Sequence, residues 1–161
     1  MHEILAEDRG PQVHPRAREQ LRRPIDSDEY VTIRERWKQH SIAEDARDLE
    51  GLIATLTDDC VYELVGSGQR WEGHDGARRF YTEFLGAFPD VRFYLQDIVI
   101  GPQGVCEVAQ VTGTFARDFA GRAATGEPRR WTVVIVFPWD PDRRLFRGER
   151  VLPVWGDDRV G

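Results

Sequence analysis

The chain is poor in the residues that cross-link small folds or hold metals. Only two cysteines, Cys60 and Cys106, occur among 161 residues, which fits reduced core thiols better than a disulfide framework. These cysteines and the four histidines show no metal-ligand spacing. We therefore expect no structural metal and no cofactor.

Long apolar runs and an excess of positive charge are also missing. The longest purely apolar run, residues 133–137, is far too short to span a membrane, and the polar N-terminus lacks the hydrophobic core of a signal peptide. The net charge of -6 comes from 28 acidic and 22 basic residues spread along the chain, which leaves no basic face. We expect a cytoplasmic protein that binds neither nucleic acid nor a membrane. The preponderance of arginine over lysine hints at a GC-rich bacterial genome.

Length and composition predict one domain preceded by an arm. With 40% hydrophobic residues, 161 residues are enough to bury a sizeable core. Residues 1–28 mix charges with Pro11, Pro15 and Pro24 and show no sustained apolar period. We interpret them as a mobile arm or, alternatively, as a segment that wraps a partner subunit. The folded domain is predicted to cover residues 29–157.

Three helices are predicted ahead of a sheet. The first opens with a cap at Asp28, and its apolar positions recur at steps of three and four residues up to Trp37 and His40. A short second helix follows over residues 49–56. The third begins after Gly73 and ends at Pro89, with an apolar stripe along one side.

Beyond the third helix the apolar period changes to two, which predicts strands. Turn signals at residues 101–104 and 140–142 make neighbouring strands hairpins, so we expect an antiparallel sheet and an α+β class. The predicted strands are residues 60–65, 91–100, 105–117, 130–139 and 145–155.

The strand at residues 131–139 is apolar on both faces. One face must meet the helices, and the other also needs cover. The economical prediction is a homodimer formed through the sheet.

Four segments, in this order, carry a family resemblance: VYELVGSG, GHDGARRFYTEFL, VTGTF and RGERVLPVW. With helices followed by a curved sheet, they resemble the cone-shaped fold of the nuclear transport factor two superfamily. The resemblance is greatest to its SnoaL-like polyketide cyclase and ketosteroid isomerase branches, over residues 28–157. It implies three N-terminal helices packed on a strongly curved antiparallel sheet that encloses a pocket. Function stays open, because this fold hosts isomerases, dehydratases, epoxide hydrolases, cyclases and binding modules.

The catalytic carboxylates of these branches are missing from the matching positions. The isomerase branch keeps a proton-shuttling aspartate where this chain has Leu64, and a second acid at about Ile135. Leucine and isoleucine cannot carry a proton, so that pair cannot operate here. The SnoaL-like branch closes its last strand with an acid, whereas this chain has Val154 there and its next carboxylates at Asp157 and Asp158.

The resemblance leaves His40 and Tyr81 as the candidate catalytic pair. A hydrogen-bonding tyrosine of the isomerase branch falls on His40, and the tyrosine of its third helix survives as Tyr81. An imidazole and a phenol that share a proton in an apolar cone are a reasonable electrophile or general acid. The alternative is that His40 is a satisfied core residue.

The pocket is expected between the helices and the concave face of the sheet. Its predicted lining, besides His40 and Tyr81, is Trp37, Tyr62, Leu64, Phe84, Ile135 and Arg150. Glu149 and Arg150 alternate across their strand, so one faces the cavity and the other makes a surface or interface ion pair.

Three further candidates stay open. Asp97 is a base or an edge residue held by an arginine, and Asp157 lies at the pocket mouth or in a solvated tail. His74 is interpreted as helping to start the third helix rather than as a chemical group.

Two functions from different classes follow. The first is a small cyclase, isomerase or dehydratase that binds a hydrophobic, oxygen-bearing molecule and uses His40 and Tyr81. The second is a non-catalytic ligand-binding or dimerisation module that has lost the carboxylates of the family. The absent acids favour the second function, and the retained pair favours the first.

Overall fold

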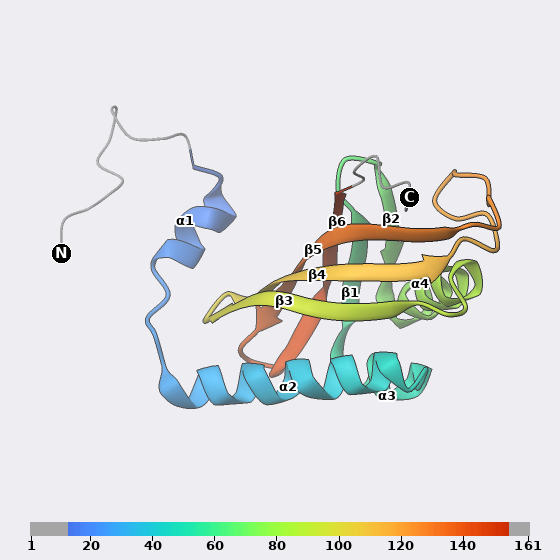
Figure 1. Cartoon of the computed structure of the whole chain (residues 1–161). Helices are drawn as coiled ribbons and strands as arrows, with labels where there is room; N and C mark the ends of the chain where they lie inside the picture. The colour runs from blue at the N-terminus through green and yellow to red at the C-terminus, as the bar shows by residue number, and fades with distance from the viewer. Residues whose placement is uncertain (1–12, 155–161) are drawn as a thin grey trace.

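The protein is organised around one six-stranded sheet, which the computed structural model describes together with its helices over residues 13–154 (Figure 1). The strand order is β2-β1-β6-β5-β4-β3. The strands are β1 (Leu56–Leu64), β2 (Gln69–Glu72), β3 (Arg92–Gly101), β4 (Gly104–Thr114), β5 (Pro128–Asp140) and β6 (Leu145–Val154). The helices are α1 (Pro15–Leu21), α2 (Ser27–Asp45), α3 (Leu49–Ile53) and α4 (Gly73–Ala87). This architecture confirms the predicted α+β class.

Helix α2 runs beside the sheet and continues into α3 (Figure 1). Its cap is Asp26, whose Oδ1 accepts hydrogen bonds of 2.8 Å from the backbone N–H groups of Asp28 and Glu29. The sequence pattern placed this cap at Asp28, which instead lies in the first turn, where its charge suits the positive end of the helix dipole. No helix within residues 13–154 is long and apolar enough to cross a membrane.

Helix α4 is the predicted third helix, and it packs on β1 and β2. Its apolar stripe is buried at Ala77, Phe80, Tyr81 and Ala87. The helix ends at Ala87, two residues before Pro89, which lacks the N–H needed to continue the hydrogen-bond ladder. The stripe therefore delivers aromatic side chains to the interior of the domain.

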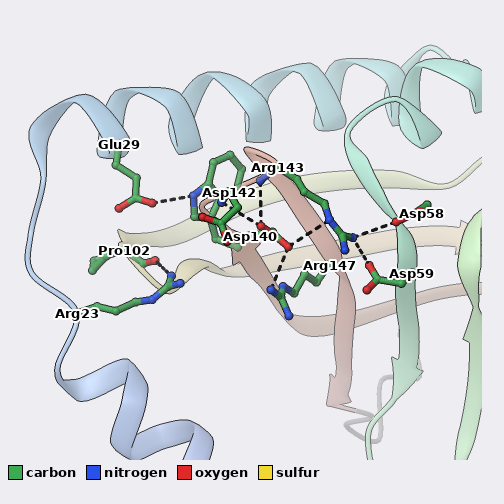
Figure 2. Close-up of polar contacts among 10 residues, drawn as sticks. Arg23, Glu29, Asp58, Asp59, Pro102, Asp140, Asp142, Arg143 and Arg147 are labelled. Atoms are coloured by element: carbon green, nitrogen blue, oxygen red, sulfur yellow. Dashed lines mark hydrogen bonds and ion pairs between the residues drawn. The ribbon is translucent and has the colours of Figure 1, made fainter.

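A short helix, α1, lies inside the segment that we predicted as an arm, where no apolar period announced it. Gln103 Nε2 donates a 2.9 Å hydrogen bond to the carbonyl of Gln20, and Arg23 donates to the carbonyl of Pro102 (Figure 2). These bonds hold residues 20–23 against the turn between β3 and β4. The mobile arm and its alternative, a segment on a partner subunit, stay predictions, and residues 1–12 lie outside the described part of the chain.

The sheet is antiparallel from β3 to β6, as the hairpin signals predicted. Strand β1, however, pairs in parallel with β6, and Val61 lies opposite Gly148. Turn signals could not predict the direction of this pair, because α4 and four strands separate β1 from β6 along the chain.

The turn between β5 and β6 is held by a buried carboxylate, that of Asp140 (Figure 2). It accepts 3.0 Å hydrogen bonds from the backbone N–H groups of Asp142 and Arg143, and it pairs with Arg147 at 3.0 Å. Burial alone raises the pKa of Asp140, but these hydrogen bonds and the neighbouring arginine charges outweigh it and lower the pKa overall. Arg143 also reaches Asp59 on β1 at 2.6 Å, so the turn is tied to that strand.

Candidate functional site

A cavity of about 700 Å³ lies against the inner face of the sheet. Most of its lining is apolar and includes an aromatic wall made of Phe80, Phe84, Phe88, Phe93, Phe115, Phe119 and Trp131. The rings pack on one another, as Phe80 and Phe84 do with centroids 6.0 Å apart and planes stacked. The polar and charged side chains of the lining are Glu44, Ser67, Arg122, Thr125, Arg129 and Glu149. Such an enclosure suits an apolar ligand oriented by a few polar groups.

Three of the six predicted pocket residues line this cavity, namely Leu64, Phe84 and Ile135. The prediction needs correction for Trp37 and Tyr62, which do not line it. Tyr62 is fully buried behind the lining ring of Phe80, at 4.9 Å between centroids. Trp37 is directed to β4, where its indole N–H donates to a carboxylate.

Arg150 is the third correction, since it lies on the outer face of the sheet, 3.4 Å from Glu63. The cause is a bulge at Gly148, which has φ of 103° and lies at a shift in the β5–β6 register. Phe146 and Glu149 are both buried although they are an odd number of positions apart, which a regular strand of period two does not allow. The bulge thus turns Glu149 into the cavity and Arg150 out of it.

His40 and Tyr81 do meet, and they meet on Glu149. His40 Nε2 lies 2.9 Å from the Tyr81 hydroxyl and 3.0 Å from Glu149 Oε1, and the Tyr81 hydroxyl donates to the same Oε1 at 2.7 Å. The exposed fraction is 1% for His40 and 0% for Tyr81, and neither side chain lines the cavity. Their route to a ligand therefore passes through the carboxylate of Glu149.

The hydrogen bonds of His40 show which ring nitrogen carries a hydrogen. The hydroxyl of Thr55 donates its single hydrogen to the carbonyl of Leu52, at 2.6 Å. It must then accept from His40 Nδ1, which lies 2.6 Å away, so Nδ1 carries a hydrogen. Nε2 then either accepts from the Tyr81 hydroxyl at 2.9 Å or shares a proton with Glu149 Oε1 at 3.0 Å. In both cases the imidazole is held against Glu149 at the wall of the cavity.

The two tyrosines beside this pair stay protonated. Burial, and then the charge of Glu149, raise the pKa of both Tyr62 and Tyr81 well above the ordinary value. Their hydroxyls are 3.0 Å apart. Both are therefore hydrogen-bond donors at neutral pH: Tyr81 donates to Oε1 of Glu149, and Tyr62 donates to the Tyr81 hydroxyl.

Two further carboxyls gather here that the sequence reasoning missed, those of Glu44 and Glu107. Glu44 lines the cavity one helical turn after His40, and its pKa is raised well above the ordinary value by burial and by the charges of Glu149 and Glu107. Glu107 is buried and accepts from Trp37 Nε1 at 2.7 Å, while burial raises its pKa to about 7. The signals were present, since each residue lies on the inward phase of its helix or strand. Within residues 13–154, no group of three or more His, Cys, Asp or Glu is arranged to hold a metal.

The remaining sequence candidates lie elsewhere. Asp97 is exposed on β3 and accepts from the backbone N–H of Ile98 at 2.8 Å. His74 lies in the first turn of α4, with Nε2 at 3.2 Å from the carbonyl of Leu56. Asp157 is outside the described residues.

Solved structures share this fold at low sequence identity. A proposed SnoaL-like polyketide cyclase from Shewanella denitrificans superposes with a TM-score of 0.66 at 11% identity, covering 76% of this chain and 90% of the other. IdmH, a proposed polyketide cyclase from Streptomyces antibioticus, superposes with a TM-score of 0.60 at 21% identity, covering 75% of this chain and 91% of IdmH. AclR from Streptomyces galilaeus, a proposed hydroxylase, superposes with a TM-score of 0.61 at 18% identity, covering 81% of this chain and 93% of AclR. A comparison with curated protein sequences finds no match.

The neighbours carry different proposed activities, so they establish the architecture rather than the reaction. A family model, in contrast, matches the sequence itself over residues 35–147, from the middle of α2 into β6. That stretch is well over half of the chain and contains His40, Tyr81 and the aromatic wall. The chain therefore belongs to the family of SnoaL-like domains.

Proposed function

We propose that this protein is a general acid/base enzyme that acts on a hydrophobic, oxygen-bearing small molecule held in the cavity. The observation that carries the proposal is the meeting of Glu149, His40 and Tyr81 at one carboxylate oxygen. In this proposal Glu149 is the catalytic residue, and His40 and Tyr81 are positioning residues.

The hydrogen bonds divide the two oxygens of Glu149 between the protein and the ligand. Oε1 is occupied by His40 and Tyr81, whereas Oε2 has no hydrogen-bond partner among residues 13–154. Because Glu149 lines the cavity, Oε2 is the oxygen that a ligand can meet. A buried carboxylate fixed through one oxygen is well placed to move a proton with the other.

The reaction class that fits is proton transfer next to a carbonyl group. Glu149 takes a proton from the carbon beside the carbonyl, and the electron pair of the broken C–H bond moves onto the carbonyl oxygen. Glu44 is the proposed proton donor to that oxygen, because burial and the charges of Glu149 and Glu107 raise its pKa well above the ordinary value and so favour its acid form. The enol formed in this way leads to isomerisation, dehydration or ring closure, depending on the substrate.

The alternative is a ligand-binding module without catalysis. The observation that favours it is that Leu64 and Ile135, at the positions of the acids in the isomerase branch, are plain apolar parts of the cavity wall. In that case the Glu149 cluster is a buried polar network that only orders the core.

The test is turnover of a panel of enones and β-keto esters by the wild type and by Glu149→Gln. The amide keeps the shape but cannot take a proton, so we expect kcat to fall by about 10²–10⁴ while ligand affinity changes little. Tyr81→Phe and His40→Phe should lower kcat by about 10²–10³ with a smaller effect on KM.

The matched control is Glu63→Gln on β1, because Glu63 lies on the outer face beside Arg150. This variant should keep full activity. Wild-type turnover that survives in Glu149→Gln would remove Glu149 from the mechanism, and no turnover of any panel member would favour the binding module.

A further inference from the structure

The charged side chains of the cavity are segregated by sign along its length. Glu44 and Glu149 line the end of the cavity near His40. The register of β6 places this end beside Val136 of β5, because Val136 pairs with Arg150, the residue that follows Glu149. Arg122 and Arg129 line the other end, to which the loop between β4 and β5 also contributes Phe119 and Thr125. An asymmetric ligand therefore meets negative charge at one end and positive charge at the other.

Strand β5 gives an estimate of the distance between the two charged ends of the cavity. Arg129, Trp131, Val133 and Ile135 follow one another on its inner face and all line the cavity. At about 3.3 Å per residue, Arg129 lies roughly 20 Å from Ile135 along the strand. The side chains at the two ends take up part of that span, and a ligand lying along the aromatic wall would occupy the rest.

Arg129 differs in its surroundings from the surface arginines Arg78, Arg143 and Arg150, which each pair with a carboxylate. Arg129 is half-buried on the inner face, and no carboxylate within residues 13–154 lies within ion-pair distance of it. A guanidinium facing an apolar cavity loses hydration, and an anion in the cavity would compensate it.

We propose that the ligand of this cavity is an amphiphilic carboxylic acid. Its carboxylate binds the guanidinium of Arg129 at the mouth, its flat apolar body lies along the phenylalanine rings and Trp131, and its other end reaches Glu149. The position of the reacting end rests on the proposed function, whereas the binding of the carboxylate does not.

Charge decides this orientation. A carboxylate at the inner end would face Glu149 across a medium of low dielectric, where like charges repel strongly. At the mouth it meets a planar guanidinium that can donate two parallel hydrogen bonds. The neutral, oxygen-bearing end of the molecule is thereby directed to the proton-transfer cluster.

The probes are pyrenebutyrate and its methyl ester, which share a flat apolar body and differ in charge. Binding is titrated by the fluorescence anisotropy of pyrene with the wild type, Arg129→Gln and Arg130→Gln. Arg130 is the matched control, because it is the next residue on β5 and is exposed. We expect the wild type to prefer the acid by about tenfold, which corresponds to 1.4 kcal/mol. Arg129→Gln should abolish the preference, and Arg130→Gln should keep it.

The ester is the more apolar probe, so a cavity without an anion site would bind the ester at least as well as the acid. Equal affinities in the wild type, a preference that survives in Arg129→Gln, or failure of both probes to bind would overturn the proposal. Circular dichroism checks that each variant is folded. Repeating the titration in Glu149→Gln separates the two proposals, because preference for the acid should persist there whether or not Glu149 is catalytic.

Discussion

At the scale of single residues, the buried carboxyl of Glu107 links the site to the stability of the fold. Its pKa is raised from 4.5 to about 7, chiefly by burial. Between pH 4.5 and about 7, the carboxyl of Glu107 is therefore protonated in the folded state and ionised in the unfolded state. Its contribution makes the free energy of unfolding fall as the pH rises through this range. We predict that Glu107→Gln stabilises the protein at pH 8 by up to about 3 kcal/mol and changes little at pH 4.5.

Urea unfolding at several pH values measures this effect. The amide oxygen that the substitution introduces keeps an acceptor for Trp37, so packing should survive the change. Glu127→Gln is the control, because Glu127 is exposed and should leave the pH dependence unchanged. A pH profile for Glu107→Gln that runs parallel to that of the wild type would contradict the prediction.

At the scale of elements, the bulge of β6 decides which side chain enters the cavity. Gly148 has φ of 103°, and a Cβ placed on it would lie 2.1 Å from the carbonyl oxygen of Val61. No side chain fits there unless β1 and β6 separate. We predict that Gly148→Ala costs more than about 3 kcal/mol of stability, and that a regular strand formed instead would turn Glu149 outward.

Gly126→Ala is the control for this change. Gly126 also has a positive φ, of 69°, but a Cβ there meets nothing within 4 Å. Chemical denaturation should show a loss for Gly126→Ala of about 1 kcal/mol, the ordinary cost of φ above zero. Similar losses for the two variants would show that contact with Val61 is not what requires glycine at Gly148.

At the scale of the whole molecule, the outer face of the sheet supports the predicted homodimer, which remains a proposal. Val134 lies at the centre of this face, with Val108 on one side and Leu152 on the other. Tyr94, Val99 and Val154 extend the apolar area and are exposed. We predict that a second copy covers this face in a two-fold dimer.

Val134→Glu tests the assembly, because it places a carboxylate at the centre of the proposed interface. We expect the dissociation constant of the dimer to rise at least about a hundredfold in sedimentation experiments. Val31→Glu is the control, since Val31 is exposed on α2. A wild type that sediments as a monomer at micromolar concentration would reject the dimer.

Sequence patterning by itself determined most of the elements and the class of the fold. The apolar periods located α2 and α4 and the strands after Pro89, because helix and strand periods depend on neighbours along the chain. The pairing of His40 with Tyr81 came from the family resemblance, and the structure places the two side chains 2.9 Å apart. The same patterning missed α1, which has seven residues and no buried side chain to create a period.

The tertiary structure alone decided which acid faces the cavity. Strict alternation from Phe146 puts Arg150 on the inner face, whereas the bulge at Gly148 reverses the phase and admits Glu149. The need for that bulge arises from close contact with Val61 of β1, a strand far away in the sequence. Local periodicity records what each residue prefers next to its neighbours, but the phase of a strand against a distant partner is set only when the sheet closes.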